Sequence, residues 1–124
     1  MASERQEIER RRQALQHQLQ ALSGAPLMRG SIYERRRRCG RPSCACATHP
    51  KARHASPFLT VFWAGRTRGF HLRAEEEAGV RQAIAAYERL WAIVNELTAC
   101  EVAELRRQVR ERQRARKKRP SQAR

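Results

Sequence analysis

The chain of 124 residues contains no aspartate, so that all twelve of its acidic residues are glutamates. It also lacks a glycine-rich phosphate loop, a nucleophile elbow and the His-Glu spacing of metalloproteases. Its glutamates cluster in segments that we expect to be helical, where they face solvent or compensate a helix dipole. From these absences we expect that the protein is not an enzyme.

Long apolar runs are also missing. The longest apolar-rich stretch, Phe58 to Ala64, is interrupted by Thr60, whereas a membrane span needs about 18 apolar residues. The first ten residues have no apolar centre like that of a secretory signal, and they carry too many acids for a transit peptide. We therefore expect a cytoplasmic protein that is not embedded in a membrane.

Positive charge, in contrast, is abundant. The chain has 27 lysines and arginines and a formal net charge of +15. The surplus lies in two blocks, +7 over residues 29–53 and +9 over 106–124, while residues 1–28 carry +1 and 54–105 carry −2. Such asymmetry predicts a folded module with one cationic face and a cationic tail. A polyanion is the expected partner, and nucleic acid is the first choice.

Local patterns predict two helices and a hairpin. Ser3 followed by Gln6 is a capping-box signature, and the apolar residues after it recur on one helical face, which predicts a helix over 4–22. The apolar run over 58–63 is typical of a central or doubly covered strand. Alternating residues over 69–73 then predict a hairpin over 58–73 that turns at 64–67, with Phe70 and Leu72 pointing inward. A long amphipathic helix over 75–105 follows from apolar residues at helical spacing: Val80, Ile84, Tyr87, Trp91 and Val94.

The predicted fold is α+β, in a single small domain over residues 1–105. An N-terminal helix precedes a small antiparallel sheet of two or three strands, which contains a cysteine-rich loop over 39–57, and a long C-terminal helix follows. Residues 106–124 form a basic tail that extends the helix and then frays, with Pro120 as a stop. The apolar stripe of the long helix could pack antiparallel on the first helix or form the coiled-coil seam of a homodimer.

The cysteine-rich loop is the most informative local feature. It reads Cys39-Gly40-Arg41-Pro42-Ser43-Cys44-Ala45-Cys46, and His49 and His54 follow. Zinc takes four converging Cys or His ligands, and a small domain with a thin core often needs such a staple. We therefore predict a structural zinc site made of the three cysteines and one histidine. His54 is preferred to His49 because it adjoins the following strand, and Cys100 is expected to pack in the long helix.

Other interpretations of the cysteines stay open. They could be reduced thiols that act as small apolar fillers. They could also serve a disulfide or redox function, although a cytoplasmic setting disfavours stable disulfides. A nucleophilic pair of Cys39 and His54 is a third alternative, and it would need a lowered thiol pKa.

Arginine is suited to phosphate because its planar guanidinium donates two hydrogen bonds at once. Four consecutive arginines, residues 35–38, cannot all point the same way from a strand, and binding should depend steeply on salt. A solvated charged face without a ligand is the alternative. The candidate nucleic-acid-binding residues are Arg29, Arg35, Arg36, Arg37, Arg38, Arg41, Arg53, Arg66 and Arg68, joined in the tail by Arg116, Lys117, Lys118 and Arg119.

Four segments together resemble an uncharacterised prokaryotic family, in chain order Leu27 to Tyr33, Arg36 to Cys46, His54 to Pro57 and Gly65 to Arg68. The family consists of small basic proteins with a Cys-Gly-Lys-Pro-Gly-Cys-x-Cys motif, a His-Gly-Pro-Tyr segment, a Gly-Lys-Thr-Arg hairpin and a long C-terminal helix. Many members are found near transposases.

This resemblance implies a DNA-directed accessory protein of mobile elements, with a transposase as a possible partner. Two other classes stay open. A helical adaptor that dimerises through its long helix would use the charge for solubility or partner choice. An RNA-binding or ribosome-associated protein would share the electrostatics but prefer structured RNA.

Overall fold

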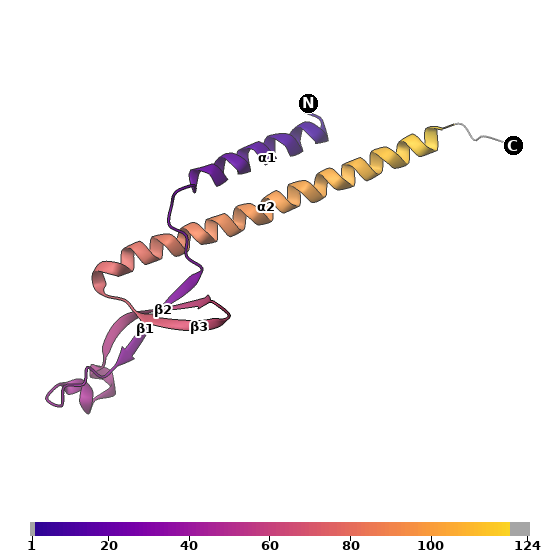
Figure 1. Ribbon diagram of the computed structural model, residues 1–124. Helices are drawn as coiled ribbons and strands as arrows, with labels where there is room; N and C mark the ends of the chain where they lie inside the picture. The colour runs from indigo at the N-terminus through magenta and orange to yellow at the C-terminus, as the bar shows by residue number, and fades with distance from the viewer. Residues whose placement is uncertain (1, 120–124) are drawn as a thin grey trace. The chain divides into compact units, whose positions relative to one another are not determined.

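The computed structural model describes residues 2–119. In chain order the elements are α1 (Glu4–Ala21), β1 (Gly30–Arg37), the short 3-10 helices η1 (Ala45–Ala47) and η2 (Pro50–Ala52), β2 (His54–Trp63), β3 (Arg66–His71) and α2 (Ala74–Lys118) (Figure 1). The strands form one antiparallel sheet in the order β1-β2-β3. This is the predicted α+β architecture. Within the described residues, neither α-helix has an apolar stretch long enough to cross a bilayer.

The element boundaries differ from the predicted ones at two places. β2 begins at His54 rather than at residue 58, because β1 continues to Arg37 and pairs with it there. The loop between β1 and β2, which we call the cysteine loop, therefore spans residues 38–53. α2 continues past residue 105 to Lys118, so that the first part of the basic tail is helical. Pro120 lies outside the described residues.

The chain divides into two compact units. The first 24 residues and the chain from Arg89 onward make the helical unit, and residues Ala25–Glu88 make the sheet unit.

In the helical unit, α1 packs antiparallel on the second half of α2. The Ser3 side chain caps α1 at Gln6 in the predicted capping box. Leu15, Ile93 and Cys100 are buried together, which confirms the packing role expected of Cys100. Partly buried apolar side chains surround them: Ile8, Leu19, Leu22 and Leu97. Pairs of opposite charge flank this core along its length, namely Arg11–Glu96, Arg12–Glu101 and Arg110–Glu4.

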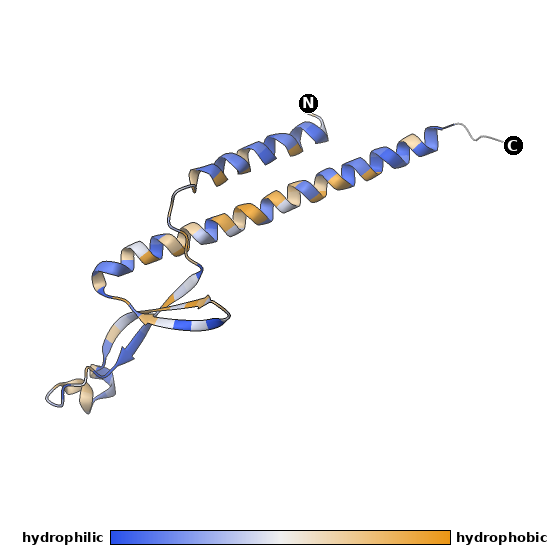
Figure 2. Cartoon of the chain, viewed as in Figure 1, coloured by the Kyte–Doolittle hydropathy of each residue, from blue (hydrophilic) through white to orange (hydrophobic). Residues whose placement is uncertain are grey.

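The buried face of α2 in this unit is not the predicted one. Trp91 is 58% exposed and Val94 is 40% exposed, whereas Ile93 is only 6% exposed. α2 therefore carries two apolar stripes. Figure 2 shows hydrophobic and hydrophilic residues alternating along this helix. α1 packs on the stripe that contains Ile93. Glu96 and Glu101 flank this stripe and pair with Arg11 and Arg12 of α1.

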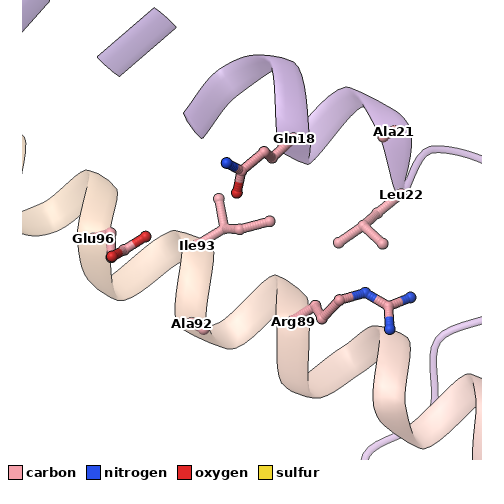
Figure 3. Close-up of a pocket in the computed structure, with 7 residues that line it drawn as sticks. All are labelled: Gln18, Ala21, Leu22, Arg89, Ala92, Ile93 and Glu96. Atoms are coloured by element: carbon pink, nitrogen blue, oxygen red, sulfur yellow. The ribbon is translucent and has the colours of Figure 1, made fainter. Parts of the chain in front are cut away.

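A groove of about 450 Å³ opens between α1 and α2 near the end of α1 (Figure 3). Leu22 and Ile93 form its apolar part, and Gln18, Arg89 and Glu96 lie at its polar rim. It contains no cysteine or histidine side chain. The groove therefore offers no metal ligand of the kind found in the sheet unit.

In the sheet unit, β2 and β3 form the predicted hairpin. Ala64 and Gly65 make the two-residue turn, both with positive φ, at 55° and 80°. Two positive φ values are typical of a type I′ turn, whose twist matches that of the flanking strands. β2 is the central strand, as predicted, but Phe62 is 57% exposed, so that β2 is not covered on both faces.

The register defines two faces of the sheet, since directly paired residues share a face. The inner face includes Ile32, paired with the buried Leu59, and Phe70 on the edge strand. Leu72 is buried, as predicted, whereas Phe70 is 44% exposed because β3 is an edge strand. The other face, which we call the outer face, carries Tyr33, Arg35, Arg37, Phe58, Phe62 and His71.

Candidate metal centre

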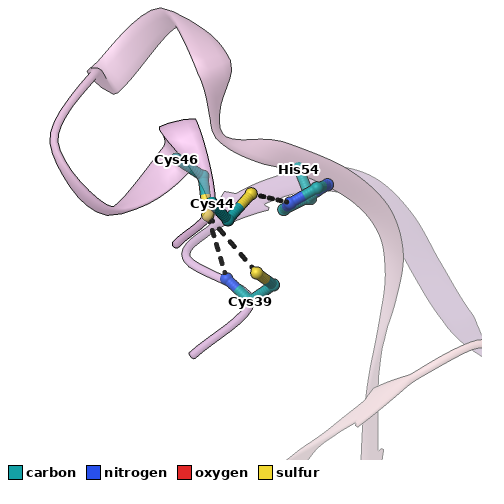
Figure 4. A group of neighbouring side chains, drawn as sticks. All are labelled: Cys39, Cys44, Cys46 and His54. Carbon is teal, nitrogen blue, oxygen red and sulfur yellow. Dashed lines mark hydrogen bonds between the residues drawn. The ribbon is translucent and has the colours of Figure 1, made fainter. Parts of the chain in front are cut away.

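Three cysteines and one histidine converge at the base of the cysteine loop. Cys39 follows the end of β1, Cys44 and Cys46 come from the start of η1, and His54 is the first residue of β2 (Figure 4). One ligand atom from each, three sulfurs and one ring nitrogen, lies within 4.8 Å of every other. The predicted ligand set is therefore brought together, with His54 rather than His49, and these four residues could hold a metal ion.

The distances suit a tetrahedral ion. The Cys44 sulfur lies 3.3 Å from Nε2 of His54, and the Cys46 sulfur lies 3.5 Å from that of Cys39. A tetrahedral zinc ion with ordinary bond lengths separates its ligand atoms by about 3.5 to 3.8 Å. Small shifts of the side chains would thus complete the coordination. All four cysteines of the chain are free thiols, and this leaves the three in the loop available as ligands.

The backbone of the loop turns the ligands inward. Gly40 has a φ of +87°, a conformation that glycine adopts without strain. The N–H of Cys44 donates to the carbonyl of Arg41, and this closes a tight turn between the first two cysteines. The N–H of Cys39 donates to the sulfur of Cys46 over 3.3 Å. Such N–H donors to ligand sulfurs orient the ligands and stabilise thiolates.

The loop also sets the acidity of its thiols. Hydrogen bonding by the backbone N–H of Cys46, and then by the thiols of Cys46 and Cys39, lowers the pKa of Cys44 below its ordinary value. At Cys46 the backbone N–H of Cys39 acts in the same direction. There, burial and the neighbouring thiols outweigh it and raise the pKa. Since the thiolate is the form that binds metal, Cys44 is better prepared to do so than Cys46.

Cys46 is the most deeply buried of the four, at 1% exposure, although it lies in a loop. His54 and Cys39 are exposed. Cys46 is the one buried side chain of the loop, and the pairing of Arg37 with His54 joins the two ends of the loop.

The arginines predicted to bind nucleic acid do not form a single surface. Within β1, Arg35 and Arg37 lie on the outer face, whereas Arg36 points to the inner face, because side chains alternate along a strand. Arg66 and Arg68 also lie on the inner face, where Arg68 stacks on Trp63 at 4.4 Å.

The other predicted basic residues lie outside the strands of the sheet unit or in the helical unit. Arg29, Arg38 and Arg41 are exposed next to β1 and in the cysteine loop, and Arg53 is half-buried there. The remaining four, Arg116, Lys117, Lys118 and Arg119, lie in the helical unit, at the end of α2 and directly after it.

His71, the last residue of β3, was not among the predicted site residues. Nη1 of Arg37 donates to its Nε2 over 3.2 Å, so that the ring is held as a neutral acceptor. Burial, and then the charges of Arg37 and Arg35, lower the pKa of His71. No local sequence pattern marks it, because its neighbours depend on the strand register, which places His71 opposite Phe58.

The fold and the cluster thus define a small α+β protein with a possible metal centre between its first two strands. Residues 5–82 match the model of a family described as a domain of unknown function (DUF6788). The chain belongs to this uncharacterised family. Searches among curated proteins and among solved structures found no match.

Proposed function

We propose that this protein is a non-enzymatic nucleic-acid-binding accessory protein that acts on DNA and serves mobile elements. The observation that carries the proposal is the placement of the Cys3His cluster at the end of the arginine-bearing strand β1. Strand, loop and cluster form one local structure. In it the metal would fix the loop, and the arginines beside it would bind phosphate.

We propose zinc as the metal. Three thiolates and one imidazole make a soft donor set that zinc prefers among common biological ions. Four protein ligands fill its tetrahedral shell and leave no open position, which is typical of structural rather than catalytic sites. With three thiolates the bound centre carries a formal charge of −1, and nearby arginines such as Arg38 and Arg41 would offset it.

The charge distribution supports phosphate as the partner of β1. Arg35 to Arg38 carry four positive charges in succession, and Glu34 is the only acid of the block from 29 to 53. All four arginines are exposed. None of them forms an ion pair with an acidic residue among the described residues. Unpaired guanidinium groups are free to displace the counterions of a nucleic acid.

Two matched variants test the proposal. One replaces Arg35, Arg36, Arg37 and Arg38 with glutamine, and the other replaces Arg116, Lys117, Lys118 and Arg119. Each removes four positive charges from the full chain. Fluorescence anisotropy with duplex DNA, single-stranded DNA and structured RNA across a salt series should show a loss of about tenfold or more in DNA affinity for the strand variant, and a smaller loss for the tail variant.

A loss of all binding in the tail variant alone would show that the protein binds nucleic acid only through its basic tail, as a nonspecific polycation, and would contradict the proposal. Tighter binding to structured RNA than to either DNA would favour an RNA or ribosome partner. Bound zinc, measured by elemental analysis, should stay unchanged in both variants, which separates lost contacts from a lost fold.

A helical adaptor is the second candidate, and the exposed apolar stripe of α2 favours it. Four side chains of this stripe are 40–58% exposed: Trp91, Val94, Val102 and Leu105. Residues 89–105 carry −2 and residues 106–118 carry +7, so that a second copy would pair antiparallel rather than parallel. Thr98, at the centre, bonds its hydroxyl to the carbonyl of Val94. Sedimentation should then show a dimer at all salt concentrations, and Trp91→Glu should dissociate it.

A further inference from the structure

One rung of the sheet carries an aromatic ring on every strand. Tyr33 of β1 pairs with Phe58 of β2, and Phe58 pairs with His71 of β3. The ring centroids of Tyr33 and Phe58 are 5.4 Å apart, and those of Phe58 and His71 are 4.9 Å apart. All three belong to the outer face, so that they form a continuous row across the full width of the sheet.

The middle ring of this row lies along the sheet instead of projecting from it. Gly69 of β3 is the reason, since a Cβ atom at this position would overlap the Phe58 ring. The glycine thus leaves room for the ring to lie down over the edge strand. The ring is half-buried there, in contact with the side chains of Tyr33, His71 and Arg35.

Two guanidinium groups accompany the rings. Cζ of Arg35 lies 4.8 Å from the centroid of Phe58, and Arg37 is hydrogen-bonded to His71. Tyr33 is 49% exposed, and Phe62, further along β2 on the same face, is 57% exposed. The outer face therefore offers stacking surfaces and phosphate-binding groups side by side.

We infer that the outer face binds unpaired bases of single-stranded DNA, by stacking on Tyr33 and its neighbours, with Arg35 and Arg37 on the phosphates. This inference rests on the proposed function and narrows its substrate. Aromatic rings and guanidinium planes stack on bases regardless of sequence, because every base has a π-face. Phe58 and Phe62 lie four residues apart, or about 13 Å along the strand, which leaves room for more than one nucleotide.

Duplex DNA fits this face less well. Its bases expose only their edges in the grooves, and a sheet reads them with side chains that stand up from its surface. Here Phe58 lies flat and Arg35 is folded onto it. The side chains of this rung are thus placed to meet the face of a base rather than its edge.

Replacement of a ring by leucine tests the inference in the full zinc-loaded chain. Tyr33→Leu keeps apolar bulk and removes the π-face. Affinity for a fluorescein-labelled oligothymidine should fall about tenfold, with less than about a twofold change for a duplex. Trp63→Leu is the matched control, since Trp63 is also exposed, at 59% against 49% for Tyr33, but lies on the inner face. It should leave both affinities unchanged.

A photochemical measurement needs no substitution in the protein. Oligonucleotides containing 5-iodouracil should crosslink to Tyr33, Phe58 or His71, as identified by mass spectrometry of the peptides. Crosslinks confined to the end of α2 would overturn the inference.

Equal losses for single-stranded and duplex DNA in Tyr33→Leu would also overturn it, as would an unchanged affinity for the single strand. In these cases binding of duplex by the wild-type chain would leave the proposed function standing. If the wild-type chain bound no nucleic acid even at low salt, the proposed function would fail and this inference with it.

Discussion

The helical unit and the cysteine loop of this chain bury their side chains in different ways. The helical unit has a conventional core around Leu15 and Ile93, bordered by ion pairs between helices. The cysteine loop of the sheet unit has Cys46 as its one buried side chain. Apolar burial thus stabilises the helical unit, and we propose that metal ligation stabilises the cysteine loop, so that each should be able to unfold while the other stays folded.

The cluster should therefore be the most sensitive part of the sheet unit. In Cys39→Ser/Cys44→Ser we expect bound zinc to fall from one ion per chain to almost none, because only two of its four ligands remain. Structural zinc contributes about 10 kcal/mol or more to the folding of small zinc-dependent domains. Hydrogen exchange should then lose protection in residues 38–53 and keep it in α1. Cys100→Ala is the control, since it removes a cysteine of the helical core and should retain zinc. Equal exchange in the loop with and without the two ligands would refute the assignment.

The converse change breaks the helical unit. Leu15 is only 3% exposed, and Leu15→Ala should cost about 3 kcal/mol through lost burial and a residual cavity. Exchange of the α1 amides should become faster, while zinc content and exchange in the cysteine loop stay as they are. A simultaneous loss of zinc would show that the two units unfold together, contrary to the comparison.

Acid should weaken the helical unit through one carboxylate. Hydrogen bonds from Arg107, with its charge, lower the pKa of Glu104 to about 2, against an ordinary value of 4.5. Because the folded-state pKa is lowered, the ionised carboxylate stabilises the unit above about pH 4.5, and this contribution is lost as pH falls from 4.5 towards 2.

The variant Glu104→Gln should thus be less stable at neutral pH and lose less stability on acidification. Thermal unfolding followed by circular dichroism measures both. Both chains should carry the Cys39→Ser/Cys44→Ser substitutions, so that release of zinc in acid does not contribute to the change in stability. If the stability of the two chains fell by the same amount over this pH range, Glu104 would be excluded as the source of the acid sensitivity.

A smaller effect is expected at the hairpin turn. Ala64 has a φ of 55°, a left-handed conformation that strains most residues but suits asparagine and glycine. Ala64→Asn should therefore raise the stability of the sheet unit by about 0.5 to 1 kcal/mol, measured by chemical denaturation of the zinc-loaded chain. Destabilisation by this change would show that the turn is not of type I′.

Sequence alone predicted the elements that depend on local patterns. The capping box at Ser3 marked the start of α1, and the turn residues marked the hairpin. The spacing of the cysteines and His54 predicted the cluster, because ligands close in sequence need only one tight turn to converge.

Features that depend on pairing could not be predicted. α2 has two apolar stripes, and only the packing of α1 shows that the one with Ile93 is buried and the one with Trp91 is not. The row of Tyr33, Phe58 and His71 requires the register of three strands. No local pattern marks Gly69 either, since its importance depends on the Phe58 ring of the neighbouring strand.

Titration of the metal-free chain with cobalt(II) tests the central claim most directly, because cobalt replaces zinc in tetrahedral sites and reports its ligands by colour. We predict saturation at one ion per chain, with intense visible absorption typical of tetrahedral coordination and a sulfur-to-cobalt charge-transfer band that disappears in Cys39→Ser/Cys44→Ser. Weak absorption typical of six-coordinate cobalt, or the same spectrum in the double variant, would contradict a metal centre made of Cys39, Cys44, Cys46 and His54.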